Sequence, residues 1–301
     1  MDKATAIKFL EQFNDSEMHT EEENFRYTEY LEYLWKETND PCYICELGGY
    51  YYEIKKFDLA LKYYEIAANA QYEPALSGLG YIWYYGRTGK TDYEKAFGYF
   101  QRSAELGNIQ SEYKVADMYK NGYFVEKDYD KYKSIIEKLY LKVKDELKLF
   151  EPVPEIYTRL AAIRVKEGSF DEAVSLYYYA RGFLSYRLRY SNFFGNLSIM
   201  KHLIHDLYKI TPLDYDYFNL YDLYALENIS CTVTFEYLGE EYEIHIISED
   251  GSYPIKFNGQ WYKTIDDFFA KASIDKYMLT EIIPEIDCCE VNIDGDNEIE
   301  Q

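Results

Sequence analysis

Residues 57–68 read FDLALKYYEIAA, and residues 93–104, which lie 36 positions further on, read YEKAFGYFQRSA. Ala60 and Ala96 occupy the same place in the two segments, and the correspondence continues through the residues that follow each of them. A sequence period in the thirties is typical of stacked-repeat architectures, in which each helix hairpin buries its apolar face against its neighbours. The period therefore predicts an α-solenoid.

Each repeat is expected to consist of a helix A, a turn and a helix B. The first repeat runs from Leu47 on helix A to Ala60 on helix B, a spacing of 13 residues. The second and third repeats have a spacing of 17 residues, and their longer turns contain glycine and aspartate, such as Gly86 and Asp92. Glycine accepts the left-handed backbone conformation of a turn, and aspartate caps the following helix. A fourth repeat, at 160–180, returns to the shorter spacing.

The short repeats resemble tetratricopeptide repeats, and the long repeats, with their glycine and aspartate turns, resemble Sel-one-like repeats. The resemblance covers roughly residues 41–187 and implies a right-handed α-solenoid that contacts other proteins and carries no catalytic site. Two features depart from the pattern. Ser103 stands where alanine recurs, and the third helix B has Tyr132 and Ile136 where alanine and an aromatic residue recur. We therefore expect looser or shifted packing in the third repeat.

The hydrophobic rhythm changes after the solenoid. Val233, Phe235 and Tyr237 alternate with polar residues, which indicates a strand, and Asn258-Gly259 is typical of a tight hairpin turn. The fold class is thus mainly α: a right-handed α-solenoid followed by a small α+β module built on four strands. The expected segments are, in order, capping helices (1–40), the solenoid (41–189), a helical continuation (190–228), the α+β module (229–293) and an acidic tail (294–301).

The chain is strongly acidic, with 54 Asp and Glu residues, 32 Lys and Arg residues and a formal net charge of −22. Binding to nucleic acid or to an anionic membrane needs cationic patches, so the charge argues against both and favours a basic protein partner. No apolar run reaches the roughly 18 residues that span a bilayer, and the first residues lack the apolar core of a signal peptide. The five cysteines, an odd number, do not suggest a secreted disulfide framework. We expect a cytoplasmic protein, and the oligomeric state stays open.

Three motifs invite a chemical interpretation, and each has a simpler structural one. Cys42 and Cys45 lie at an expected helix start, where a thiolate is stabilised, but the second ligand pair of a metal site and the strand of a redox site are absent. His202 and His205 share a helix face but supply only two metal ligands. The segment 294–298, DGDNE, lacks the spacing of a calcium loop. We therefore expect no catalytic residue, no cofactor and no metal.

The inner face of the solenoid is the expected binding surface. In tetratricopeptide-like repeats this face is formed by helix A, and tyrosine is enriched in the hot spots of protein interfaces. The alternative is that some of these tyrosines pack against helix B or the next repeat. The strongest candidates are Tyr52, Tyr81, Tyr84, Tyr85, Tyr113, Asp117 and Lys120.

These observations favour a non-enzymatic protein that binds a partner protein. One version is an immunity protein that neutralises a cationic toxin by capping its active surface. Two other classes stay open. One is an enzyme whose site lies in residues 190–293, with the solenoid as its docking platform. The other is a nucleic-acid mimic that presents carboxylates to a DNA-binding protein.

Overall fold

The computed structural model describes residues 2–13, 20–144, 152–191, 195–286 and 289–293. The chain divides into two compact units, Met1–Leu147 and Lys148–Gln301. In its described part the first unit is built from helices alone, whereas the second combines helices with antiparallel sheet. The expected acidic tail at 294–301, with its DGDNE segment, lies outside the described residues.

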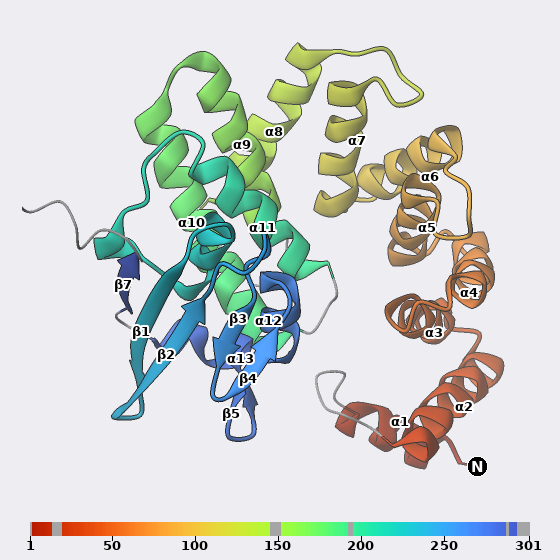
Figure 1. The fold of residues 1–301 in the computed structure, drawn as a ribbon. Helices are drawn as coiled ribbons and strands as arrows, with labels where there is room; N and C mark the ends of the chain where they lie inside the picture. The colour runs from red at the N-terminus through yellow and green to blue at the C-terminus, as the bar shows by residue number, and fades with distance from the viewer. Residues whose placement is uncertain (1, 14–19, 145–151, 192–194, 287–288, 294–301) are drawn as a thin grey trace, which may run out of the picture. The chain divides into compact units, whose positions relative to one another are not determined.

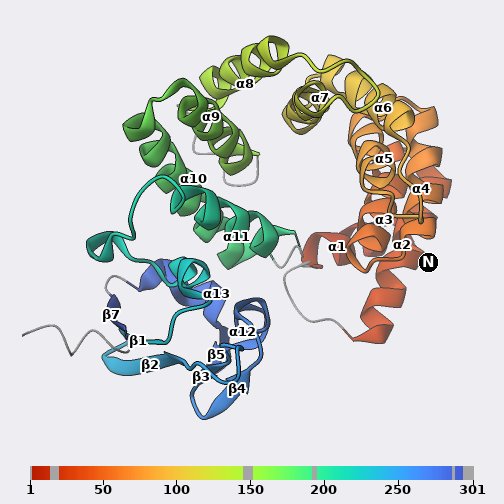
Figure 2. The same cartoon turned by 45° about the horizontal axis from the view of Figure 1, so that its top comes forward.

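Helices follow one another in chain order through the described part of the first unit (Figures 1 and 2). They are α1 (Lys3–Gln12), α2 (Glu21–Thr38), α3 (Pro41–Glu53), α4 (Phe57–Asn69), α5 (Glu73–Tyr85), α6 (Tyr93–Glu105), α7 (Ile109–Asn121) and α8 (Tyr129–Val143).

Three hairpins of the predicted solenoid lie in this unit: α3 with α4, α5 with α6, and α7 with α8. The A helices also touch one another, because α3 contacts α5 and α5 contacts α7. The B helices α4, α6 and α8, which the structure describes from end to end, are joined to one another less closely. The A helices therefore form the inner layer of the first unit, as the resemblance implies.

The long turns are built as the sequence predicts. The second repeat ends its helix A at Gly86, whose φ of +60° is left-handed, and an added Cβ there would lie 2.7 Å from the backbone nitrogen of Thr91. Asp92 then caps α6, because its side chain accepts a hydrogen bond from the backbone N–H of Lys95 at 3.0 Å. Asp128 caps α8 in the same way. These caps satisfy helix N–H groups that have no partner within the helix.

The small residues of helix A allow the bulky residues of helix B to approach closely. The ring of Tyr64 on α4 lies against two glycines, because a Cβ on Gly48 would stand 2.7 Å from it and a Cβ on Gly78 would stand 2.6 Å from it. Gly80 makes the same room for Phe100, at 2.5 Å. Tyr64 thereby connects helix A of its own repeat with helix A of the next.

The positions that depart from the repeat pattern are nonetheless in the core. Ser103 is fully buried, and its hydroxyl bonds with Glu73 at 2.5 Å and with Ser111 at 2.8 Å, so the polar group is satisfied. Tyr132 and Ile136 on α8 are also buried. The third hairpin thus accommodates a large side chain where the other repeats use alanine.

The second unit opens with a fourth hairpin, α9 (Val153–Glu167) and α10 (Phe170–Tyr190), whose turn contains Gly168 at a left-handed φ of +80°. Arg187 on α10 pairs with Glu155 on α9 through two short contacts, 2.7 and 3.1 Å, and both side chains are buried. Helix α11 (Asn196–Leu207) packs against α10. It lies within the predicted helical continuation at 190–228.

The segment after α11 differs from the sequence prediction. We expected α-helix to continue to residue 228, but this part of the chain has two short 3₁₀ helices, η1 (Tyr215–Tyr217) and η2 (Leu220–Leu226). The reason lies in Asp222, which accepts a hydrogen bond from the backbone N–H of Asn219 at 2.7 Å and pairs with Arg181 of α10. The carboxylate of Asp222 is fully buried. Its hydrogen bond to Asn219 makes a new helical segment, η2, begin after that residue, and its ion pair with Arg181 holds η2 against α10.

The C-terminal module contains a five-stranded antiparallel sheet in the order β4-β3-β2-β1-β7. Its strands are β1 (Cys231–Tyr237), β2 (Glu240–Ile246), β3 (Ile255–Phe257), β4 (Gln260–Tyr262) and β7 (Cys289–Ile293). Four of them match the four predicted strands, and β7 is an addition. The remaining elements are α12 (Ile265–Lys271), a small hairpin of β5 (Ser273–Ile274) and β6 (Tyr277–Met278), α13 (Leu279–Ile282) and η3 (Ile283–Glu285).

Candidate functional site

The residues predicted to line the inner face do lie on the A helices of the first unit. Tyr52 is on α3, three tyrosines are on α5, and Tyr113, Asp117 and Lys120 are on α7. Their exposure differs. Tyr85 is 46 % exposed and Lys120 is exposed, whereas Tyr113 is only 5 % and Asp117 only 7 % exposed. The half-buried members are Tyr52, Tyr81 and Tyr84.

The tyrosines of α5 form one connected aromatic cluster with their neighbours on α7. The rings of Tyr81 and Tyr85 are parallel at 6.1 Å, and Tyr84 meets Tyr85 edge-on at 5.0 Å. The hydroxyls of Tyr81 and Tyr113 are hydrogen-bonded at 2.9 Å, which links α5 to α7. We call Tyr52, Tyr81, Tyr84 and Tyr85 the tyrosine surface.

Lys114, which lies at the centre of this cluster, is not among the residues predicted from the sequence. Its side chain is buried, and its ammonium nitrogen lies 4.9–5.4 Å from the ring centres of Tyr81, Tyr84, Tyr85 and Tyr113. Attraction between an ammonium and aromatic ring faces is strongest where water is excluded. Asp117 lies 3.9 Å away, one helical turn along α7, and supplies the opposite charge.

A second cation, Arg87, lies beside the same tyrosines. Its Nε donates a hydrogen bond to the Tyr52 hydroxyl at 3.2 Å, and its guanidinium carbon lies 4.8 Å from the ring centre of Tyr85. The ring of Phe57 is 5.4 Å from it. Arg87 therefore joins the tyrosine of α3 to those of α5.

Two phenols of the tyrosine surface, those of Tyr84 and Tyr52, have a raised pKa. Burial raises the pKa of Tyr84 above its ordinary value, and the charge of Lys114 offsets only part of this increase. Burial likewise raises the pKa of Tyr52, against the opposing hydrogen bond from Arg87. Tyr84 and Tyr52 thus present neutral hydroxyls beside the cations Lys114 and Arg87.

The cysteine and histidine motifs make contacts within the fold. Cys45 is buried, and burial raises the pKa of its thiol to about 12, so it does not form a reactive thiolate. His202 contacts the carbonyl oxygen of Ser198 at 2.6 Å, and His205 contacts that of Tyr224 at 3.2 Å. Within the described residues, no group of three or more His, Cys, Asp or Glu side chains is arranged to hold a metal ion.

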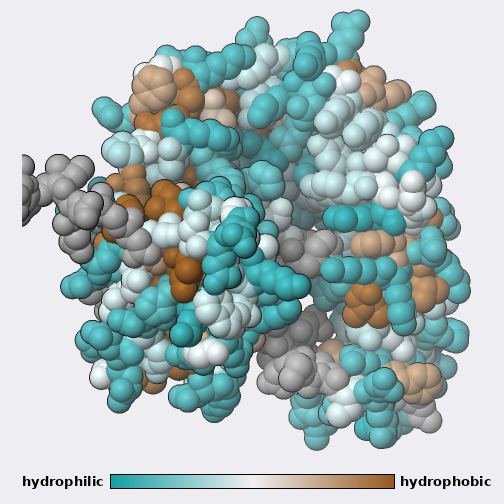
Figure 3. Space-filling model, in the orientation of Figure 1, coloured by the Kyte–Doolittle hydropathy of each residue, from teal (hydrophilic) through white to brown (hydrophobic). Residues whose placement is uncertain are grey.

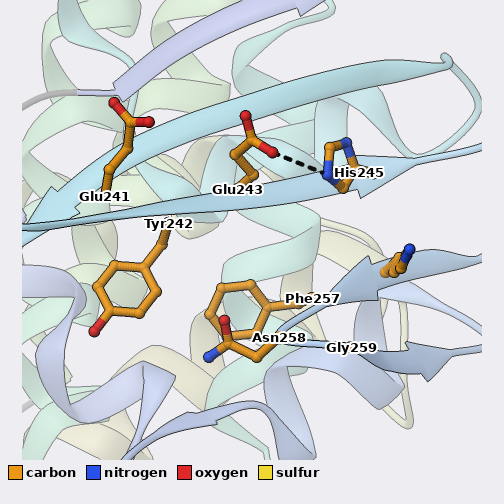
Figure 4. A pocket seen from close by; sticks show the side chains of 8 residues that line it. Glu241, Tyr242, Glu243, His245, Phe257, Asn258 and Gly259 are labelled. Atoms are coloured by element: carbon orange, nitrogen blue, oxygen red, sulfur yellow. Dashed lines mark ion pairs between the residues drawn. The ribbon is translucent and has the colours of Figure 1, made fainter.

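The C-terminal module has a hollow of about 460 Å³ at the β2 and β3 strands. Glu241, Glu243 and His245 project from one side of β2, whereas Tyr242 and Phe257 lie on the other (Figure 4). His245 lies 3.3 Å from Glu243, and both carboxylates are exposed to solvent. These groups lie along an open strand instead of converging on one point, so the hollow does not suggest a reaction.

The visible surface offers no single apolar face. In Figure 3 the hydrophobic residues form small, separate patches among hydrophilic ones. Among the helices that the structure describes, none has both the length and the apolar character that crossing a membrane requires.

Comparison with known proteins identifies the repeats. A family model described as Sel1 repeat matches residues 43–72, 74–108 and 109–131, so each match starts on an A helix and continues into a B helix. The first unit therefore carries Sel1 repeats, which typically serve as scaffolds for protein–protein interaction. No family is identified for the C-terminal module, and no curated protein matches the chain.

Solved structures with similarity to the chain include three repeat proteins. A Sel1 repeat protein from Oxalobacter formigenes is 18% identical, with a TM-score of 0.46 over 68% of this chain and 89% of that one. The protein c5321, a protective antigen of uropathogenic Escherichia coli strains with an SLR fold, is 18% identical, with a TM-score of 0.42 over 62% of this chain and 37% of that one. YrrB, a TPR protein with an unusual peptide-binding site, is 15% identical, with a TM-score of 0.39 over 66% of this chain and 98% of that one.

Proposed function

We propose that this protein binds a partner protein through the tyrosine surface on the A helices of its Sel1 repeats. One observation carries the proposal: partly exposed tyrosines on the A helices α3 and α5 are joined to one another by ring contacts and by Arg87. Tyrosine and arginine are enriched in interface hot spots because they combine a large apolar area with a polar end. Arg87 and Tyr85 bring these two residue types together within one cluster.

The partner that fits the whole chain is basic. A net charge of −22 attracts a cationic protein over a distance and steers its approach, whereas it repels nucleic acid and anionic membranes. At the tyrosine surface itself the cations are Arg87 and Lys114, the latter paired with Asp117, so the steering is assigned to the net charge of the whole chain. In this proposal the net charge attracts the partner, and the tyrosine surface makes the contact.

An immunity protein in the cytoplasm that caps a cationic toxin is one specific form of this function. It is supported by the acidity and by a repeat fold that presents a large binding surface. Coexpression tests it directly: the chain should rescue cells from a toxin encoded beside it. Failure to protect against every neighbouring toxin candidate would remove this form and leave the general proposal in place.

The general proposal is tested by replacing two tyrosines of the surface, half-buried Tyr84 and exposed Tyr85. The variant Tyr84→Ala with Tyr85→Ala should keep the helical circular dichroism spectrum but lose capture of the native partner by at least about tenfold, as expected for hot-spot residues. The matched control is Tyr179→Ala, because Tyr179 is 63 % exposed but lies on α10 of the second unit. Partners are identified by affinity capture and mass spectrometry and then quantified with purified protein. Equal binding by the double variant and the wild type would refute this surface.

A further inference from the structure

Lys114 occupies a repeat position at which the preceding repeat needs a glycine. With the offset of 36 residues, Lys114 corresponds to Gly78, where an added Cβ would stand 2.6 Å from the ring of Tyr64. Lys114 is only 4 % exposed. Removing an ammonium group from water costs several kcal/mol unless the surroundings compensate for it. This position therefore departs from the repeat at a cost that its neighbours must offset.

The compensating groups are the carboxylate of Asp117, 3.9 Å from the ammonium, and the aromatic residues of the proposed binding surface. The ammonium donates a hydrogen bond to the hydroxyl oxygen of Tyr85 at 2.9 Å, and the rings of Tyr81 and Tyr84 lie within 5.4 Å of it. These tyrosines are on α5, whereas Lys114 is on α7. The buried ammonium of Lys114 on α7 thus holds the tyrosine rings of α5, the preceding A helix, in place.

The direction of this hydrogen bond determines what Tyr85 can do next. A lysine ammonium has only donors, so the Tyr85 oxygen must be the acceptor. The phenolic proton of Tyr85 is then available to donate outward, and the side chain is 46 % exposed. Acceptance from a charged donor also polarises the hydroxyl and strengthens the bond that it donates.

We propose that Lys114 is the positioning residue of the tyrosine surface, and that it presents the Tyr85 hydroxyl as a hydrogen-bond donor to a backbone carbonyl oxygen of the partner protein. A backbone carbonyl oxygen of a bound peptide is an acceptor that this phenolic donor fits. This inference rests on the proposed function and adds the chemistry of the contact. The tyrosine rings provide apolar contact area, and the Tyr85 hydroxyl provides a directed hydrogen bond.

The first test needs no partner. Tyrosine-ring resonances of the full chain are compared by NMR for wild type, Lys114→Met and Lys114→Arg. Loss of the charge should shift or broaden the rings of Tyr81, Tyr84 and Tyr85, and arginine should restore them in part because it keeps the cation. The control is Lys131→Met, since exposed Lys131 also donates to a tyrosine hydroxyl, that of Tyr119 at 2.8 Å, and should disturb only that ring. Unchanged α5 tyrosine resonances in Lys114→Met would overturn the proposal.

The second test measures binding of a peptide selected on the full chain from a displayed random library. Tyr85→Phe keeps the ring and removes the hydroxyl, so it should weaken binding about three- to tenfold, the value of one hydrogen bond. Lys114→Met should weaken binding at least as much, and Lys131→Met should bind like the wild type. Tyr85→Phe also covers the case in which Lys114→Met fails to fold.

Two adverse results can be told apart. If Tyr85→Ala abolishes peptide binding but Tyr85→Phe does not weaken it, the rings bind without a directed hydroxyl, and the inference about Lys114 is wrong while the proposed surface stands. If Tyr85→Ala also binds like the wild type, the tyrosine surface is not the binding site, and both the inference and the proposed function fail.

Discussion

At the scale of single residues, the repeats depend on the absence of side chains at two positions around Tyr64. Gly48 and Gly78 flank its ring, and a Cβ at either position would come closer to the ring than any ordinary carbon contact. We predict that Gly48→Ala and Gly78→Ala each lower the free energy of unfolding by about 1–3 kcal/mol, because the ring must shift and the hairpins must separate slightly. Urea denaturation followed by circular dichroism measures the change.

The control for this prediction is Gly98, which lies inside α6 with no atom within 4 Å of an added Cβ. Glycine inside a helix costs about 0.5–1 kcal/mol relative to alanine, so Gly98→Ala should stabilise the protein. If all three substitutions were stabilising, helix propensity would dominate and the close packing around Tyr64 would not matter.

The candidate surface could be predicted from the sequence only in part, and single residues show why. The repeat register placed the tyrosines of α5 and the residues of α7 on the A helices, because helix periodicity decides that. It could not separate exposed Tyr85 from buried Tyr113, since their burial depends on how α5 and α7 pack. The change from Gly78 to Lys114 between repeats was visible in the sequence, but only the structure reveals the rings around the ammonium.

At the scale of elements, α7 and α8 are joined by a small ion-pair network. Glu112 on α7 accepts hydrogen bonds from Lys138 at 3.0 Å and Lys142 at 2.8 Å on α8. Burial raises the pKa of Glu112, but the two ammonium groups lower it by more, so this pKa lies below its ordinary value. A carboxylate with a lowered folded-state pKa contributes stability above its unfolded-state pKa, and the contribution is lost as the pH falls through the folded value.

We predict that Glu112→Gln lowers the free energy of unfolding by about 0.5–1 kcal/mol at neutral pH, a modest value because both lysines are exposed and screened. The difference between variant and wild type should shrink as the pH falls below about 4, where the unfolded carboxylate is protonated. Denaturation curves at several pH values measure this. A difference that grew on acidification would contradict the assigned direction of the pKa shift.

The fourth hairpin contains a different kind of ion pair, because Glu155 and Arg187 are both buried. Removing one partner leaves an uncompensated charge in a dry environment, so Arg187→Met should cost about 3–5 kcal/mol. Replacing both, as in Glu155→Leu with Arg187→Met, should recover most of that loss. A double-mutant cycle by urea denaturation gives the coupling, and additive single effects would show that the two charges act independently.

The elements themselves were largely predictable, and the exceptions have a common physical cause. The A and B helices followed from periodicity and caps, which are local signals. The two 3₁₀ helices replaced an expected α-helix because Asp222 pairs with Arg181, a residue 41 positions away. Strand β7 was missed because its partner strand β1 lies far back in the sequence, with Phe235 opposite Cys289. Long-range pairing decided both cases, and no local pattern reports it.

At the scale of the whole molecule, the net charge and the tyrosine surface are expected to control different rate constants. Charge attracts a basic partner over about a Debye length, roughly 10 Å at 0.1 M salt and 3 Å at 1 M. The tyrosines act only after contact, when their rings and hydroxyls are desolvated. A chain with a net charge of −22 should therefore find its partner quickly and release it according to the quality of the tyrosine contact.

We predict that rising ionic strength lowers the association rate constant for the captured partner by about tenfold or more, while the dissociation rate constant changes little. The variant Tyr85→Ala should do the opposite, raising dissociation with almost no effect on association, because one neutral side chain does not alter the long-range field. Surface plasmon resonance across a salt series, with Tyr179→Ala as the control, separates the two effects. An association rate constant independent of salt would mean that the acidity does not select the partner, and the basic partner would then be the part of the proposal to abandon.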